Sequence, residues 1–196
     1  GDGAVEVRYP AHQPLSYVRD HVLLEIGPLA SWIPHGQAAI RSYVAEHVAG
    51  LAKDDLTTVK VTTAERTFWE KATILHQQAH LEKAPQARYS RHYYDLYMLN
   101  RNGTTETALA DMDLLREVAA FKERFYPSRA SRYDLATPDT LRLLPDPKKL
   151  GQLEDDYRRM RVMMFASPPV WSDIVAALRV LERRINSSVT GARESP

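Results

Sequence analysis

No cysteine occurs among the 196 residues of this sequence. Disulfide bonds, zinc sites built on thiolates and cysteine nucleophiles are therefore excluded. The sequence also has no apolar run near the roughly 20 residues of a membrane-spanning helix, and its first residues lack the basic and then apolar pattern of a signal peptide. Together these absences predict a cytoplasmic protein with no membrane partner.

An excess of charge of either sign is missing as well. Lys and Arg number 26 and Asp and Glu number 25, for a formal net charge of +1, so no overall electrostatic field predicts binding to nucleic acid. Arginines cluster near the C-terminus, but acidic residues are interleaved with them, which favours ordinary solvated helix faces. These acidic residues are Glu154, Asp155, Asp156 and Glu182.

The remaining composition is that of an ordinary globular chain, with 44% hydrophobic and 26% charged residues. The first third of the sequence has the character of β-structure. Residues 5–9 alternate apolar and polar side chains, and short apolar runs at 21–26 and 56–61 also predict strands. Apolar residues between 40 and 51 fall at helical spacing and indicate a weak helix. We expect residues 1–61 to be the remnant of a larger sheet.

From residue 62 the pattern becomes helical. A capping box at Thr62 and Glu65 predicts a helix that runs to about His80, and Ser90 can cap a second helix that ends near Gly103. Further helices are expected at 114–125, stopped by Pro127, from Asp146-Pro147 to about 164, and at 174–185. The fold class is therefore predicted as α+β, with a helical portion over 62–186 and a disordered tail over 187–196.

The densest group of reactive side chains lies on the first two predicted helices. If these helices pack against each other, Lys71 and Asp95 can approach the same cleft, where the lysine could bind phosphate. The alternative is structural, with Lys71 in a surface salt bridge and Asp95 paired to Arg91 four positions earlier. Because Asp95 lies among tyrosines, its carboxylate is expected to have a defined partner.

Two other patterns resemble metal-binding motifs, but each is better explained without a metal. His76 and His80 lie one helical turn apart, which is a zinc-helix spacing, but no third ligand is evident. A metal-dependent hydrolase therefore stays a minor alternative. Asp111 and Asp113 form a D-x-D pattern at the start of a predicted helix, where side chains at i and i+2 point apart. They are interpreted as acids of a first helical turn, favoured by the helix dipole.

Four segments in order carry a resemblance to a known family: AERTFWEKATILHQQAH, RYSRHYYDLYML, YDLATPDTLRLLP and DYRRMRVMMF. Over about residues 5–186 the sequence resembles the AbiEii/AbiGii-type toxins, a family of nucleotidyltransferases. The resemblance implies a partial nucleotidyltransferase-type sheet followed by a mainly helical C-terminal portion. It also implies a toxin of a bacterial toxin–antitoxin or phage-defence system that transfers a nucleotide from an NTP to an acceptor such as tRNA, with a cognate antitoxin as a partner.

The resemblance also implies site residues. The family's helical lysine falls on Lys71 and its later aspartate on Asp95, which would be the catalytic pair. Arg91 and His92 join Lys71 as candidates for binding the NTP. Glu25 falls near the third acidic strand position of the wider fold and is the candidate ligand for Mg²⁺.

One part of the family pattern has no counterpart here. The turn of small residues and the strand D-x-D that hold two magnesium ions in such enzymes would come before Val5. We therefore expect the chain to be an incomplete fragment that does not catalyse alone, cut from the intact protein or encoded by a degenerate gene. The rival function, from a different class, is a non-catalytic module that binds RNA or protein.

Overall fold

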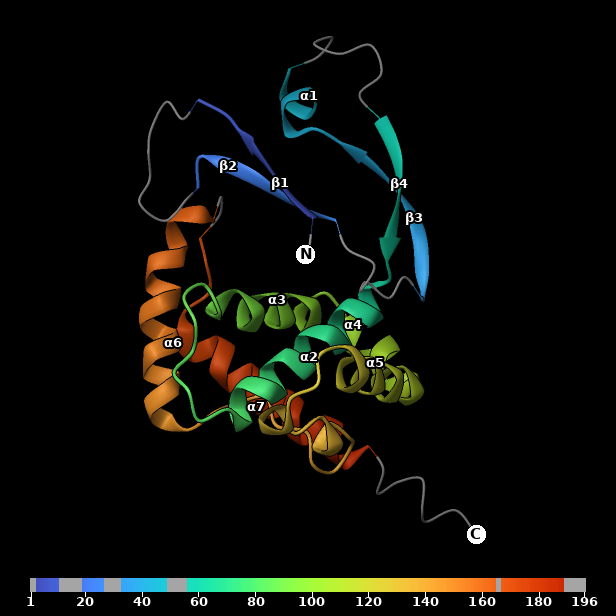
Figure 1. The fold of residues 1–196 in the computed structure, drawn as a ribbon, viewed down its shortest axis with the longest axis vertical. Helices are drawn as coiled ribbons and strands as arrows, with labels where there is room; N and C mark the ends of the chain where they lie inside the picture. The colour runs from blue at the N-terminus through green and yellow to red at the C-terminus, as the bar shows by residue number, and fades with distance from the viewer. Residues whose placement is uncertain (1–2, 11–18, 27–32, 49–55, 165–166, 189–196) are drawn as a thin grey trace.

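The computed structural model describes residues 3–10, 19–26, 33–48, 56–164 and 167–188. Figure 1 shows two parts. The strands, which come first in the chain, lie at the top with the short helix α1, and the other helices pack together beneath them. The predicted α+β class, with strands first and helices after, is confirmed. No helix in the described ranges is both long and apolar enough to cross a membrane.

The strands form two separate antiparallel pairs. Strand β1 (Gly3–Arg8) pairs with β2 (His21–Ile26), and β3 (His35–Arg41) pairs with β4 (Leu56–Thr62). Strand β3 was not predicted, because HGQAAIR contains small residues and no clear apolar alternation. The helix expected within 40–51 is limited to α1 (Tyr43–His47), since Ile40 belongs to β3.

Helix α2 (Ala64–His80) crosses the middle of the helical part. Its buried residues Phe68, Trp69, Ala72 and Leu75 recur at helical spacing and explain why this segment is a helix. The predicted cap is wrong by one position. The N-cap is Thr63, whose hydroxyl accepts a hydrogen bond from the Arg66 N–H at 3.3 Å.

Helix α3 (Ser90–Arg101) begins differently from the prediction. Ser90 is its first residue, and the N-cap Tyr89 makes no side-chain hydrogen bond. The acceptor is the carboxylate of Asp156, on a distant helix, which receives the N–H of Arg88 at 2.8 Å and the N–H of Ser90 at 3.0 Å. The helix ends near Gly103 as expected, because glycine tolerates the left-handed φ of 85° found there.

The remaining helices complete the lower layer. They are α4 (Thr104–Ala110), α5 (Met112–Phe125), η1 (Arg129–Ser131), η2 (Tyr133–Leu135), α6 (Pro147–Met160), η3 (Arg161–Met163) and α7 (Trp171–Ser187). The predicted start at Asp146-Pro147 is confirmed, because the Asp146 carboxylate accepts the Lys149 N–H at 3.0 Å. Helix α6 ends at Met160 and a 3₁₀ turn covers the rest of the expected span. Helix α4 was not predicted, and residues 189–196 lie outside the described ranges.

Two of the acidic residues expected on solvated faces are structural instead. Asp156 is 4% exposed, and its carboxylate holds the start of α3. The Glu182 carboxylate on α7 accepts the N–H groups of Leu143 at 2.5 Å and Leu144 at 3.3 Å. The prediction of solvated helix faces is wrong for Asp156 and Glu182 for the same reason. Backbone N–H groups at buried segment ends require acceptors, and these carboxylates supply them.

The hydrophobic core belongs to the helices. Most of its largest buried side chains come from α2, α3, α5, α6 and α7, among them Trp69, Tyr93, Leu115, Leu153 and Ile174. The predicted apolar face of α7 is confirmed, since Ile174, Leu178, Leu181 and Ile185 are all buried. No strand side chain within the described ranges is buried. The rigid support for any site in this chain is therefore the helical layer.

Candidate functional site

The two residues that sequence patterns single out lie next to each other. The Lys71 ammonium on α2 donates to the Asp95 carboxylate on α3 at 2.7 Å, across 24 positions of sequence. Their side chains are 22% and 37% exposed. The ion pair that spacing suggests between Arg91 and Asp95 is not formed within the described ranges. Lys71 is therefore an interhelical residue and not part of a surface pair along one helix.

His92 touches the same lysine. Its Nδ1 lies 3.3 Å from Lys71 Nζ. Because an ammonium group has only donors, Nδ1 must accept, which places the ring proton on Nε2. Burial, together with the positive charges of Lys71, Arg91 and Lys122, lowers the pKa of His92 to about 3. His92 is therefore a neutral side chain that orients Lys71 and adds no charge of its own.

Arg91 and Glu25 are the other two site residues predicted from the sequence. Arg91 is exposed on the first turn of α3, and no hydrogen bond or ion pair involves it within the described ranges. It is close enough to lower the pKa of His92. Glu25 lies in β2 opposite Ala4, but its side chain is outside the described part of the structure. Its role as a metal ligand stays a prediction.

A second ion pair lies one turn before Lys71 on α2. The buried Arg66 guanidinium donates through Nε to the Glu70 carboxylate at 3.0 Å and through Nη1 to the Ile33 carbonyl oxygen at 2.5 Å. The latter bond joins the helical layer to the segment that enters β3. The carboxylate of Glu70 is thus occupied by the guanidinium, just as that of Asp95 is occupied by Lys71.

Lys122 on α5 is a third cation near Arg66 and Lys71, and the sequence patterns did not single it out. Its ammonium donates to the main-chain oxygen of Glu70 at 3.0 Å. Burial lowers its pKa to about 8, and the charges of Lys71 and Arg66 act in the same direction against the opposing effect of Glu70. A signal was present in the sequence. Lys122 follows the buried Leu115, Val118 and Ala119 at helical spacing, so a lysine occupies the apolar stripe of α5.

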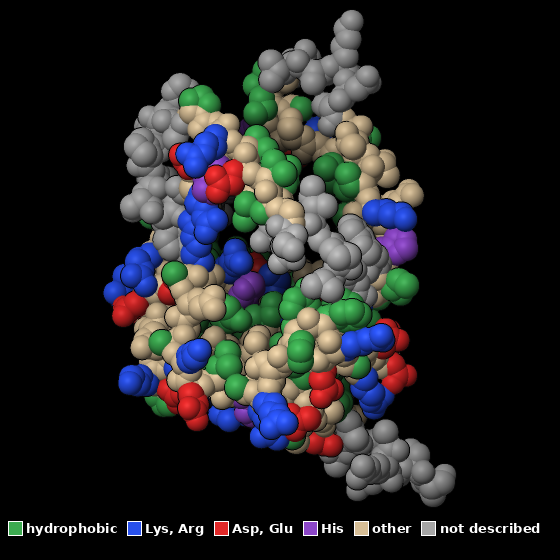
Figure 2. All heavy atoms as spheres, in the orientation of Figure 1, with side chains coloured by type: hydrophobic (Ala, Val, Ile, Leu, Met, Phe, Trp, Pro, Cys, Tyr) green, Lys and Arg blue, Asp and Glu red, His purple; other side chains and the backbone are tan. Residues whose placement is uncertain are grey.

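Together these side chains form what we term the basic cluster: Arg66, Glu70, Lys71, His92, Asp95 and Lys122, from α2, α3 and α5. Arg66, Lys71 and Lys122 are its cations, and Glu70 and Asp95 are its carboxylates. Figure 2 shows basic and histidine side chains gathered in a hollow between the strand pairs and the helices. Such a group suits an anion with several oxygens, such as a phosphate chain.

The same residues do not fit a metal ion. Both carboxylates of the basic cluster already bind cations of the chain, and the described residues contain no group of three or more His, Cys, Asp or Glu side chains arranged around one point. A two-metal site needs several carboxylate oxygens free for the ions.

The alternative metal site at His76 and His80 also fails on geometry. His76 is buried, its Nε2 donates to the Arg132 carbonyl oxygen at 2.8 Å, and its Nδ1 accepts the Arg142 N–H at 3.0 Å. Neither ring nitrogen is left for a metal. Asp111 and Asp113 match their prediction, because Asp111 caps α5 through the Leu114 N–H at 3.2 Å and Asp113 pairs with Arg116 in the first turn.

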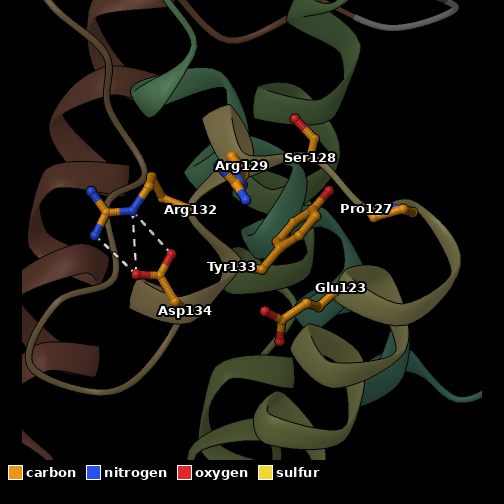
Figure 3. A pocket seen from close by; sticks show the side chains of 7 residues that line it. All are labelled: Glu123, Pro127, Ser128, Arg129, Arg132, Tyr133 and Asp134. Atoms are coloured by element: carbon orange, nitrogen blue, oxygen red, sulfur yellow. Dashed lines mark hydrogen bonds and ion pairs between the residues drawn. The ribbon is translucent and has the colours of Figure 1, made fainter.

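A separate pocket lies beside the 3₁₀ turns that follow α5. Its volume is about 500 Å³, and Figure 3 shows the seven lining side chains, Glu123, Pro127, Ser128, Arg129, Arg132, Tyr133 and Asp134. Arg132 and Asp134 bind each other at one side of it. The pocket shares no residue with the basic cluster, and the opposite charges that line it do not favour an anion.

Comparison with known proteins agrees with the resemblance noted in the sequence. A family model described as "Nucleotidyl transferase AbiEii toxin, Type IV TA system" matches residues 1–179. No curated protein and no solved structure matches the chain. The matched range includes every residue of the basic cluster.

Proposed function

Because this chain belongs to the AbiEii family of nucleotidyl transferase toxins from type IV toxin–antitoxin systems, we propose that its basic cluster holds the phosphate chain of an NTP during nucleotide transfer. One observation carries the proposal. The Lys71 ammonium is fixed between two helices by the Asp95 carboxylate at 2.7 Å and by His92 Nδ1 at 3.3 Å. A cation held in this way is preorganised for an anionic ligand.

The chemistry assigned to these residues is positioning and charge neutralisation. An ammonium group has three donors, so Lys71 keeps one for a phosphate oxygen after serving Asp95 and His92. In the transfer itself the acceptor hydroxyl oxygen bonds to the α-phosphorus and its proton passes to water. The bond from the α-phosphorus to the oxygen bridging to the β-phosphorus breaks, and pyrophosphate leaves. Lys71 stabilises the charge that develops on the pyrophosphate.

Asp95 acts by holding Lys71, and Arg91 is proposed to contact the acceptor. Arg91 is exposed on the first turn of α3, where a guanidinium can bind a backbone phosphate of an acceptor such as tRNA. Nucleotidyltransferases generally use a divalent metal such as Mg²⁺. The described residues do not fit one, so no step is assigned to it.

Membership of the family supports a proposal for the biological setting. We propose a toxin that modifies its acceptor in the cytoplasm, where NTP and tRNA are found, that acts in phage defence, and that is countered by a cognate antitoxin. The competing function is a non-catalytic module that binds RNA or protein, in which the basic cluster would only stabilise the fold.

The experiment compares Lys71→Met and Asp95→Asn in the protein expressed from its gene. We expect each to lower growth inhibition and the rate of nucleotide transfer by about a hundredfold or more, because charge stabilisation that acts in the transition state is lost. Melting temperatures should change little. Lys148→Met, at an exposed lysine of α6, and Glu82→Gln, at an exposed position after α2, are matched controls.

The outcomes separate the two functions. Full toxicity of both variants would show that the site assignment is wrong. Loss of folding in both would mean that the cluster is structural, in support of the binding module. Loss of activity with retained folding, in the two cluster variants and in neither control, supports the transferase.

A further inference from the structure

The position of Lys122 is unusual for a lysine. It continues the stripe of α5 that packs against α2, after the buried residues Leu115 and Val118. Lysine is almost never buried without a partner, because removing its charge from water is costly. Packing alone therefore does not explain why a lysine occupies this apolar stripe.

Among the described residues, no carboxylate forms an ion pair with Lys122. Glu70, whose charge raises the pKa of Lys122, binds Arg66 at 3.0 Å, and Asp95 binds Lys71 at 2.7 Å. Within the described ranges, Lys122 donates to the main-chain oxygen of Glu70 and to no other group. Two of the three donors of its ammonium are therefore unused.

We propose that Lys122 is a second phosphate-binding residue, which together with Lys71 grips the phosphate chain of the NTP from two different helices. This inference rests on the proposed function of the basic cluster. A phosphate chain fits the available charge because it carries several anionic oxygens and can bridge two ammonium groups. Lys122 is then a binding residue, whereas His92 and Asp95 position Lys71.

The charge balance of the basic cluster favours this arrangement. With Arg66 and Lys71 each matched by a carboxylate, and with His92 neutral, the uncompensated positive charge of the cluster is that of Lys122. The charged and titratable groups that interact with it are Glu70, Lys71 and Arg66 on α2 and His92 on α3. An anion placed between Lys71 and Lys122 would meet this positive charge and accept hydrogen bonds from the unused donors.

The position of Lys122 also makes binding depend on pH. Its pKa in the free protein is about 8, and only the ammonium form can donate to an anion. Bound phosphate therefore raises this pKa. By linkage, affinity is highest below about pH 8 and falls as the pH rises through that value.

The test measures binding of inorganic tripolyphosphate and of an NTP to the purified chain by titration calorimetry. We expect Lys122→Met to weaken binding of both ligands about tenfold or more, because a charged hydrogen bond to the phosphate chain is lost. The melting temperature should stay the same or rise, since the charge of a partly buried ammonium group is removed. Lys148→Met, at an exposed lysine of α6, is the control and should bind like the wild type.

Lys122→Arg and Lys71→Met make the result decisive. Arginine stays charged, so Lys122→Arg should bind but lose the fall in affinity near pH 8. If Lys71→Met weakens binding while Lys122→Met does not, or if the fall near pH 8 persists in Lys122→Arg, the inference is wrong and the proposed function stands. If the wild type binds neither ligand, or Lys71→Met also binds normally, the proposed function itself is wrong.

Discussion

Burial acts on four nitrogen bases among the described residues in the same direction. With the help of neighbouring cations, it lowers the pKa of His76 to about 4, of His92 to about 3 and of Lys122 to about 8, and it also lowers the pKa of His80. For His76 the neutral ring is needed, because Nδ1 accepts the Arg142 N–H and a protonated ring could not. Packing in the helical layer thus affects which of its basic side chains carry a charge.

We predict that the fold loses stability in mild acid. In the unfolded chain a histidine titrates near 6.5, so above this pH both states are neutral and the histidines have no effect. As the pH falls from about 6.5 towards 4, only the unfolded chain takes up protons. The free energy of unfolding should therefore fall by about 3 kcal/mol for His76 alone, which urea denaturation at a series of pH values would measure.

His76→Gln provides the control for this prediction. A glutamine amide can donate to the Arg132 carbonyl oxygen and accept the Arg142 N–H, as the neutral ring does, but it does not titrate. The variant should show a smaller loss of stability between pH 6.5 and 4. An unchanged slope would mean that His76 is not the group responsible.

Residue by residue, sequence reasoning was most successful for two residues on neighbouring, strongly periodic helices. Lys71 and Asp95 each lie on a strongly periodic helix, so their approach could be anticipated from packing. The pairing of Arg66 with Glu70 fits the i,i+4 spacing of one helix. The bond from Arg66 to the Ile33 carbonyl oxygen could not be anticipated, because it joins segments 33 positions apart. Lys122 was missed for a simpler reason, since its helix was considered only for its apolar face.

At the scale of secondary structure, the beginning of α3 depends on α6. The Asp156 carboxylate accepts the Ser90 hydroxyl at 2.6 Å in addition to two main-chain N–H groups. A local window favours Ser90 as the cap, because serine is a common N-cap. The true acceptor is 66 positions away in sequence, and no local pattern contains that information.

We predict that Asp156→Ala destabilises the protein by about 3 kcal/mol, because it leaves buried donors without an acceptor. Asp156→Asn keeps one acceptor oxygen and should cost less. Denaturant unfolding would measure both. Asp155→Ala, at an exposed neighbour on the same helix, should change stability by less than about 0.5 kcal/mol. Equal effects of Asp155→Ala and Asp156→Ala would contradict the assigned role.

For the molecule as a whole, the two layers differ in how they are held. The helices share one core, whereas apolar side chains of the strand pairs, among them Val5, Val22 and Leu56, remain exposed. The α+β division could be predicted from the change in periodicity at residue 62. The separation of the strands into two pairs could not, because pairing partners are chosen by contacts between distant segments.

We predict that the strand pairs open far more readily than the helices. Isolated two-stranded hairpins are marginal in water, so amides of β1 and β2 should exchange with deuterium at low protection. Amides of α2, which lies at the centre of the core, should exchange only with global unfolding. Hydrogen exchange read by mass spectrometry would test this. Strand amides as protected as those of α2 would show that the strands belong to the same cooperative unit.

The dependence of α3 on Asp156 has a consequence during protein synthesis. The ribosome adds roughly 5 to 20 residues per second, so about 3 to 12 seconds separate the appearance of Asp95 from that of Asp156. Through this interval the start of α3, just before Arg91 and His92, lacks the Asp156 carboxylate that accepts its N–H groups in the folded protein. The residues proposed to bind phosphate on α3 are therefore held in their final positions only after α6 has been made.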